Sequence, residues 1–278
     1  MLPIKKLYID SRLKTADSVS DSNFKIDLPY VIQLPPNTVF FITDVCIPHV
    51  WKTVEADYND RLYLQVMTNG SGFVDYVAQL AAGNYTNQTF VTALQVALNN
   101  AVGNTFVVSG PASNTDDNWL QIATNDPNKI FRILTDVEIP SIQSWSNTTV
   151  NPGNLASAND IINNTIVPAL NYNQSIPFKC EFLNLHPINN IYITSPNLGS
   201  FDTLAAFSNN IIKKVPVLSN YGFMIIDQFM TNNDFLDCSR QTIKTLEFHL
   251  RDGRGRLINM HGCHCTFSIV FNKYNTEG

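Results

Sequence analysis

The stretch from Lys244 to Phe271 constrains the fold most, because apolar and polar residues alternate along it in two successive arms. The apolar positions are Leu246, Phe248 and Leu250 in the first arm, and Cys263, Cys265, Phe267, Ile269 and Phe271 in the second. A period of two places each set on one face of a strand. The segment 251–256 between the arms contains Asp-Gly, a strong hairpin signal. We predict a final β-hairpin whose apolar face needs a second sheet to cover it, as in a β-sandwich.

Short strand patterns recur in both outer parts of the chain. They cover residues 7–9, 24–28, 38–47 and 61–67, and then 178–185, 190–194, 211–217 and 223–226. Residues 67–175 differ, since they hold two Lys/Arg against seven Asp/Glu, and 2 − 7 equals the whole net charge of −5. We therefore predict a mainly β fold in which a sandwich formed by residues 1–66 and 176–278 is interrupted by an inserted α+β head, residues 67–175.

One helix is predicted inside the head. Its apolar stripe at helical spacing is Phe90, Ala93, Leu94, Ala97, Leu98 and Ala101. Thr86 is a suitable N-cap, and Gly103 can end the helix. Short strands are expected after it, at residues 105–108, 119–123 and 130–134.

The composition excludes several classes of protein. Charged residues make up only 15% of the 278 residues, which favours a surface that assembles with neighbours. A net charge of −5 gives no electrostatic reason to bind nucleic acid or an anionic membrane. No apolar run approaches the ~18 residues of a membrane span, and the basic start is not followed by the apolar region of a signal peptide. The five cysteines, an odd number, indicate reduced thiols.

The sequence His261-Gly262-Cys263-His264-Cys265 looks most like a metal site. Zinc requires thiolates and imidazoles that converge on one point. In a strand, Cys263 and Cys265 would face one side and His264 the other, so we favour a structural role over a metal.

Two further candidates also have a functional and an ordinary interpretation. His49 could act as a base, but no serine or cysteine near an acid–histidine pair has a nucleophile signature, and we favour an ordinary loop histidine. Arg251, Arg254 and Arg256 crowd one turn, where guanidinium groups could bind an oxyanion. The alternatives are a solvated turn and an ion pair between subunits, and we favour these.

Several short phrases spread over nearly the whole chain resemble a known family. They are Leu7-Tyr8-Ile9-Asp10-Ser11-Arg12, Ser20-Asp21-Ser22-Asn23-Phe24, Leu28-Pro29, Pro35-Pro36-Asn37-Thr38, Ile47-Pro48-His49-Val50-Trp51, Ile191-Tyr192-Ile193-Thr194-Ser195, Ile212-Lys213-Lys214-Val215-Pro216-Val217, Leu246-x-Phe248-x-Leu250-x-Asp252-x-x-Gly255 and Phe267-Ser268-Ile269-Val270-Phe271. Together they resemble the minor capsid (penton) proteins of the Polinton/Maverick and virophage lineage. The resemblance is weakest across residues 67–175.

The resemblance implies a single jelly-roll, with two antiparallel four-stranded sheets, that forms homopentamers at the five-fold vertices of an icosahedral shell. The implied partners are copies of the chain and the double jelly-roll major capsid protein, and a host receptor is a further candidate partner of the head. The implied location is the virion vertex, after synthesis in the host cytoplasm or nucleus. The arm Asp10–Ser22 lacks a core pattern, and we expect it to reach neighbouring capsomers.

We expect no enzyme activity, no cofactor, and no catalytic, cofactor-binding or metal-binding residues. The main alternative is a carbohydrate- or receptor-binding β-sandwich whose head carries the activity. A hydrolase on a sandwich scaffold is a third alternative, which would need a nucleophile–base pair around His49 or His264.

Overall fold

The computed structural model describes residues 4–111, 118–135, 137–147, 166–167, 177–198, 210–229, 231 and 234–274. The chain divides into two compact units. Met1–Trp51 and Ile188–Gly278 form the first, which we call the sandwich unit, and Lys52–Pro187 forms the second, the inserted unit. Among the described residues, no helix is long and apolar enough to cross a membrane.

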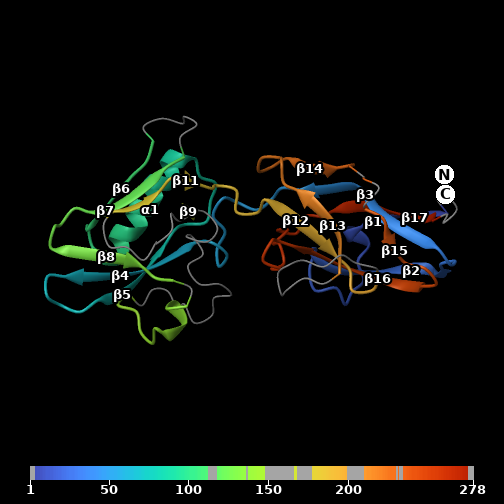
Figure 1. The fold of residues 1–278 in the computed structure, drawn as a ribbon, viewed down its shortest axis with the longest axis horizontal. Coiled ribbons are helices and arrows are strands. Elements are labelled where there is room, and N and C mark those ends of the chain that lie inside the picture. Colours follow the sequence, from blue (N-terminus) through green and yellow to red (C-terminus); the bar gives the residue numbers. More distant parts are fainter. Residues whose placement is uncertain are drawn as a thin grey trace. The chain divides into compact units, whose positions relative to one another are not determined.

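The sandwich unit contains two antiparallel sheets (Figure 1). Its strands are β1 (Lys5–Asp10), β2 (Asn23–Gln33), β3 (Thr38–Pro48), β12 (Asn190–Thr194), β13 (Ile211–Pro216), β14 (Met224–Asp227), β15 (Leu236–Asp237), β16 (Thr242–Arg251) and β17 (Thr266–Lys273). One sheet has the order β1-β17-β3-β14, and the short β15 also pairs with β3. The other has the order β13-β12-β16-β2.

This strand order is that of a jelly-roll. Without the short β15, the unit has eight strands in chain order. The first sheet then holds the first, eighth, third and sixth strands, and the second sheet holds the fifth, fourth, seventh and second. Two interlocked Greek keys produce this order. The predicted single jelly-roll is therefore confirmed, and the inserted unit lies between its third and fourth strands.

The predicted final hairpin is wrong, although both of its arms are strands. β16 pairs with β2 and β12, whereas β17 pairs with β1 and β3, so the two arms lie in different sheets. Phe248 of β16 and Phe267 of β17 meet edge to face, with ring centroids 5.0 Å apart. A hairpin would place both apolar rows on the same face of one sheet. In opposite sheets each row covers the other, which removes more apolar surface from water.

The described residues of the inserted unit form two three-stranded antiparallel sheets, a two-stranded pair and one long helix. The elements are β4 (Arg61–Thr68), β5 (Val74–Gln79), α1 (Asn87–Val102), β6 (Phe106–Ser109), β7 (Leu120–Thr124), β8 (Lys129–Ile133), β9 (Ile166–Val167), β10 (Phe178–Cys180) and β11 (Phe182–Leu183). The sheets have the orders β5-β4-β8 and β10-β7-β6, and β11 pairs with β9. One continuous core joins buried side chains of α1 and of both three-stranded sheets.

Capping residues define both ends of the helix α1. The Thr86 hydroxyl accepts a hydrogen bond from the Thr89 amide at 3.3 Å, and the Thr89 hydroxyl accepts one from the Thr86 amide at 2.8 Å. This reciprocal capping box satisfies two amides that would otherwise lack partners. Gly103 ends the helix with φ of +79°, a conformation that glycine adopts without a steric penalty. Both predicted ends are confirmed.

The boundaries between the units differ from the predicted ones. Residues 61–67 were expected in the sandwich, but β4 is the central strand of the sheet that it forms with β5 and β8. Residues 178–185 were also expected there, yet β10 pairs with β7 of the inserted unit. The strand patterns were correct, but a period of two does not reveal which sheet a strand joins. The insertion therefore runs from Lys52 to Pro187 rather than from 67 to 175.

The contact between the two sheets predicts a large effect of one core substitution. Phe248→Ala removes a fully buried ring whose centroid also lies 5.6 Å from that of the Phe24 ring. We expect this substitution to lower the free energy of unfolding by about 3–5 kcal/mol. Denaturant titration of the sandwich unit measures the loss. Tyr274→Ala, at a position 57% exposed, is the control and should change stability by less than about 0.5 kcal/mol. Similar losses in both variants would contradict this core assignment.

The corrected boundary predicts which fragment folds alone. A fragment of residues 52–187 retains β4, whose buried Leu62, Leu64 and Val66 belong to the core, and we expect cooperative thermal unfolding by circular dichroism. A fragment of residues 67–175 lacks β4 and β10, and we expect no cooperative transition. Cooperative melting of the shorter fragment would contradict this boundary.

Candidate functional site

The arm Asp10–Ser22 is built into its own sandwich and connects β1 to β2. The Ser11 amide donates to the Cys265 carbonyl at 3.0 Å, and the Thr15 amide donates to the Lys25 carbonyl at 2.9 Å. The Lys25 amide donates to the Ser18 hydroxyl at 2.9 Å. Short side chains can satisfy strand-edge groups without an apolar pattern, and for that reason the arm was mistaken for a free extension. The arm is thus bonded to its own unit and is not a free extension, and its expected contact with neighbouring capsomers stays a prediction.

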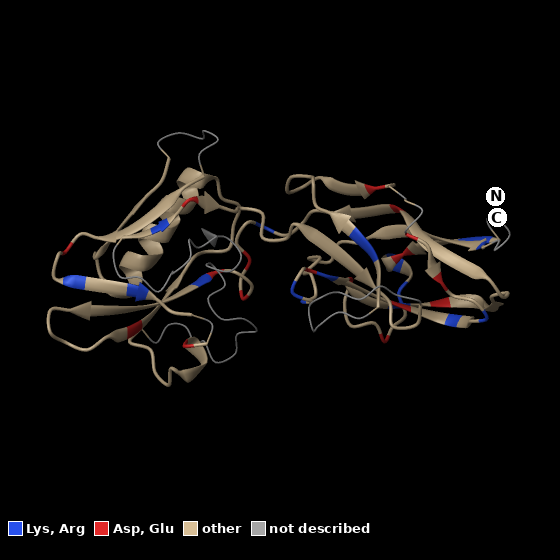
Figure 2. Ribbon diagram, in the orientation of Figure 1, with Lys and Arg blue, Asp and Glu red and all other residues tan. Residues whose placement is uncertain are grey.

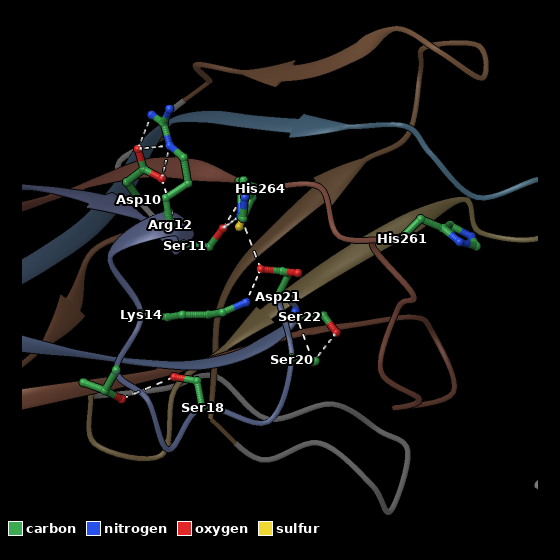
Figure 3. Close-up of polar contacts among 12 residues, drawn as sticks. Asp10, Ser11, Arg12, Lys14, Ser18, Ser20, Asp21, Ser22, His261 and His264 are labelled. Atoms are coloured by element: carbon green, nitrogen blue, oxygen red, sulfur yellow. Dashed lines mark hydrogen bonds and ion pairs between the residues drawn. The ribbon is translucent and has the colours of Figure 1, made fainter.

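Two side chains of the arm meet one from the segment before β17 (Figure 3). His264 Nδ1 lies 3.3 Å from an Asp21 carboxylate oxygen and 3.5 Å from the Ser11 hydroxyl. Asp21 also accepts a hydrogen bond from Lys14, and the Ser11 hydroxyl accepts one from the Cys265 amide at 3.0 Å. The cluster holds the arm against the segment that leads into the start of β17.

This Ser–His–Asp group does not have the geometry of a hydrolase. A catalytic relay places the serine on one ring nitrogen and the carboxylate on the other. Here Ser11 and Asp21 both lie against Nδ1 of His264. Ser11 is also fully buried and already accepts the Cys265 amide. We therefore assign the group a positioning role. The sequence contains no signal for it, because more than 240 positions separate Ser11 from His264.

The second polar contact of the arm is an ion pair between Asp10 and Arg12. Arg12 Nε lies 3.0 Å from each Asp10 carboxylate oxygen, and the Arg12 amide donates to the same carboxylate at 3.0 Å. The hydrogen bonds from the Arg12 side chain hold the pKa of Asp10 below its usual value, against a smaller opposing effect of burial. The carboxylate thus caps the short 3-10 turn Ser11–Leu13 that starts the arm.

A pocket of about 330 Å³ lies beside the arm, between residues 20–22 and 257–262. Ser20 and Ser22 face it, with their hydroxyls 3.1 Å apart, and Asp21 adds a carboxylate. Apolar side chains of Leu257, Ile258 and Met260 belong to the other wall. The lining can accept a small polar group, and no metal-binding set of three or more His, Cys, Asp or Glu side chains occurs among the described residues.

The segment His261–Cys265 is a turn, not the strand expected there. His261 and Gly262 have φ of +48° and +77°, and β17 begins only at Thr266. Cys265 is buried, and desolvation raises the pKa of its thiol to about 12, so a thiolate is strongly disfavoured. His264 points towards the arm (Figure 3), where its Nδ1 lies against Asp21 and Ser11.

His49 is a buried residue that joins two strands. Its ring lies 4.4 Å from the Trp51 ring, and its Nδ1 lies 2.7 Å from the Ser219 carbonyl. A carbonyl only accepts, so Nδ1 carries the proton that is donated. Its backbone exchanges hydrogen bonds with Gly222 and Phe223. This arrangement fits the ordinary interpretation, in which the ring supports the end of β3 beside β14.

Two of the three arginines, Arg254 and Arg256, contact the buried Asp252 carboxylate. Asp252 accepts hydrogen bonds from the amides of Arg254 and Arg256 at 2.8 and 2.9 Å, and from Arg256 Nε at 2.9 Å. Arg251 donates to the Gly255 carbonyl at 2.6 Å and contacts His249 Nδ1 at 3.3 Å. The cluster thus shapes its own turn, and Arg251 and Arg256 are directed inwards instead of forming an oxyanion clamp.

The chain was compared with family models, curated proteins and solved structures. No family model and no curated protein matches the chain. A crystal structure of the SeMet-labelled mavirus penton protein is similar, with a TM-score of 0.48 and 10% sequence identity. The match covers 97% of this chain and 100% of that one.

The Asp10–Arg12 pair predicts a specific pH dependence. A carboxyl group whose folded-state pKa is lowered stabilises the fold above its unfolded value near pH 4, and this contribution disappears as the pH falls through the lower folded-state value. Because Arg12 is largely exposed, we expect Asp10→Asn to cost at most about 1 kcal/mol at pH 7. In thermal melts, the difference in Tm between the variant and the wild type should shrink as the pH falls from 7 to 2.

Arg12→Gln is the matched variant for this prediction. It removes the main cause of the lowered pKa and should abolish the same pH-dependent part of stability. A difference in Tm from the wild type that stays constant across the acid range in both variants would contradict the role of the ion pair.

Proposed function

We propose that the chain is a structural capsid protein that forms homopentamers at the five-fold vertices of an icosahedral shell. The observation that carries the proposal is the jelly-roll order of β1-β17-β3-β14 and β13-β12-β16-β2, in a unit whose sequence phrases resemble penton proteins. A fold alone does not define a function. The polar clusters of the same unit therefore provide the second argument.

The chemistry of the described polar clusters supports a non-enzymatic role. The Ser11–His264–Asp21 group and the Asp252 turn satisfy their own hydrogen bonds and stabilise the scaffold. Polar side chains that bond within the sandwich unit fix its shape, which a capsid protein needs for contact with neighbouring subunits.

The proposed partners follow from the proposed position at a vertex of an icosahedral shell. Five copies would form the vertex, and a double jelly-roll major capsid protein would surround it. The inserted unit lies between the third and fourth strands, so its length can vary without disturbing the sheets. It is the part that we propose for contact with a host receptor.

A carbohydrate- or receptor-binding protein remains the second candidate, and the pocket beside the arm favours it. Its hydroxyls, carboxylate and apolar wall are groups that can bind a small polar ligand. This pocket belongs to the sandwich unit, whereas the carbohydrate- or receptor-binding alternative expected the site in the head.

The proposal predicts a discrete mass in solution. Light scattering of the purified full chain should give five times the mass of one chain, because five identical units related by rotation close a ring. A monomer at every concentration, together with glycan binding that is lost in an Asp21→Asn variant, would contradict the capsid proposal and support the second candidate.

A further inference from the structure

The flank of the sandwich unit at β14 exposes a dense apolar strip. Its large side chains are between 45% and 89% exposed: Leu218, Tyr221, Phe223, Met224, Ile226 and Phe229. Among the described strands, β14 is the last of its sheet and pairs only with β3. An open strand edge presents unpaired backbone groups, and proteins usually protect it with charge. We call residues 218–229 the β14 flank.

Charge protection is missing from this flank. β14 has the sequence Met-Ile-Ile-Asp, so its one charged residue is acidic, and the strand carries red but no blue in Figure 2. That position, Asp227, turns inwards to Lys213 of β13, with 3.5 Å between the charged atoms and both side chains less than a tenth exposed. Lys213 also donates to the Phe229 carbonyl at 2.6 Å. The ion pair ties β13 to β14 and leaves the outer surface apolar, which is typical of an interaction site.

The opposite flank of the same unit carries a second apolar strip. The exposed side chains are Tyr8, Leu13, Val19, Tyr30 and Val31, from 51% to 77% exposed. β1 and β2 are the last strands at this end of the two sheets, and Lys5 Nζ lies 4.3 Å from the centre of the Tyr30 ring and so joins them. We call β1, β2 and the arm between them the β1–β2 flank.

We infer that the β14 flank of one copy docks against the β1–β2 flank of the next copy, an inference that rests on the proposed function. Two arguments favour a second copy as the occupant. The unit offers two different apolar strips at opposite ends, which is what a head-to-tail contact needs. In addition, strand directions alternate across β1, β17, β3 and β14, so β14 runs antiparallel to β1. A neighbour brought alongside with the same strand direction therefore continues the antiparallel order.

A head-to-tail contact is directional, so it can be tested by blocking each flank separately. Ile226→Glu places a carboxylate on the β14 flank, and Tyr8→Glu places one on the β1–β2 flank. Both positions are more than 60% exposed, so the fold should remain, and circular dichroism melts check this. Val107→Glu is the matched control, because Val107 is exposed on the edge strand β6 of the inserted unit.

Light scattering of the full-length chains gives the readout. We expect the wild type and Val107→Glu to assemble, and each flank variant alone to remain monomeric, with association weakened about tenfold or more. An equal mixture of Ile226→Glu and Tyr8→Glu chains retains one intact pair of flanks, and we expect it to form a dimer that grows no further.

Other outcomes overturn the inference in distinguishable ways. If the wild type assembles and Ile226→Glu assembles equally well, the proposed function survives and the assigned contact fails. If Ile226→Glu is monomeric while Tyr8→Glu assembles, the β14 flank pairs with itself or with another surface. If the mixture stays monomeric, the two flanks do not meet. A wild type that remains monomeric removes the proposed function and this contact with it.

Discussion

The contact between the inner faces of two sheets is the constraint on which the sandwich unit depends. Phe248 of β16 and Phe267 of β17 meet across the interior, and Phe24 of β2 adds a third ring beside Phe248. Neither sheet can bury its apolar row alone. The chain therefore has to cross between sheets after β16, and the Asp252-centred turn and the residues that follow it provide this crossing.

The polar parts of the unit make this crossing possible. Strands that leave one sheet and enter another leave backbone groups at their ends, which must find partners. Ser11 and Asp252 supply them at two such places, through the Cys265 amide and through the amides of Arg254 and Arg256. Residues that looked like candidates for catalysis or ligand binding are thus explained largely by the needs of the backbone.

The two flanks differ from the interior in how their polar groups are used. The Lys213–Asp227 pair removes charge from the surface of the β14 flank and places it between two strands. On the opposite flank Lys5 Nζ lies over the Tyr30 ring, and the exposed Arg12 is paired with Asp10. A unit whose interior polar groups are paired and which has exposed apolar side chains on two opposite flanks fits a repeated building block, and this connects the fold with the proposed role in a shell.

The sequence by itself determined most of the strand segments and both ends of the helix Asn87–Val102, because alternation and capping act between near neighbours. It did not indicate β5 (Val74–Gln79), and it started the last strand at Cys263 instead of Thr266. The alternating row through Phe248 and the capping residues Thr86 and Gly103 are local signals of this kind. Only the tertiary structure decided that β16 and β17 lie in different sheets and that β4 belongs to the inserted unit. It also decided that Ser11, Asp21 and His264 meet. Those outcomes depend on which apolar faces cover one another over long sequence separations, and a local pattern carries no information about the partner of a face.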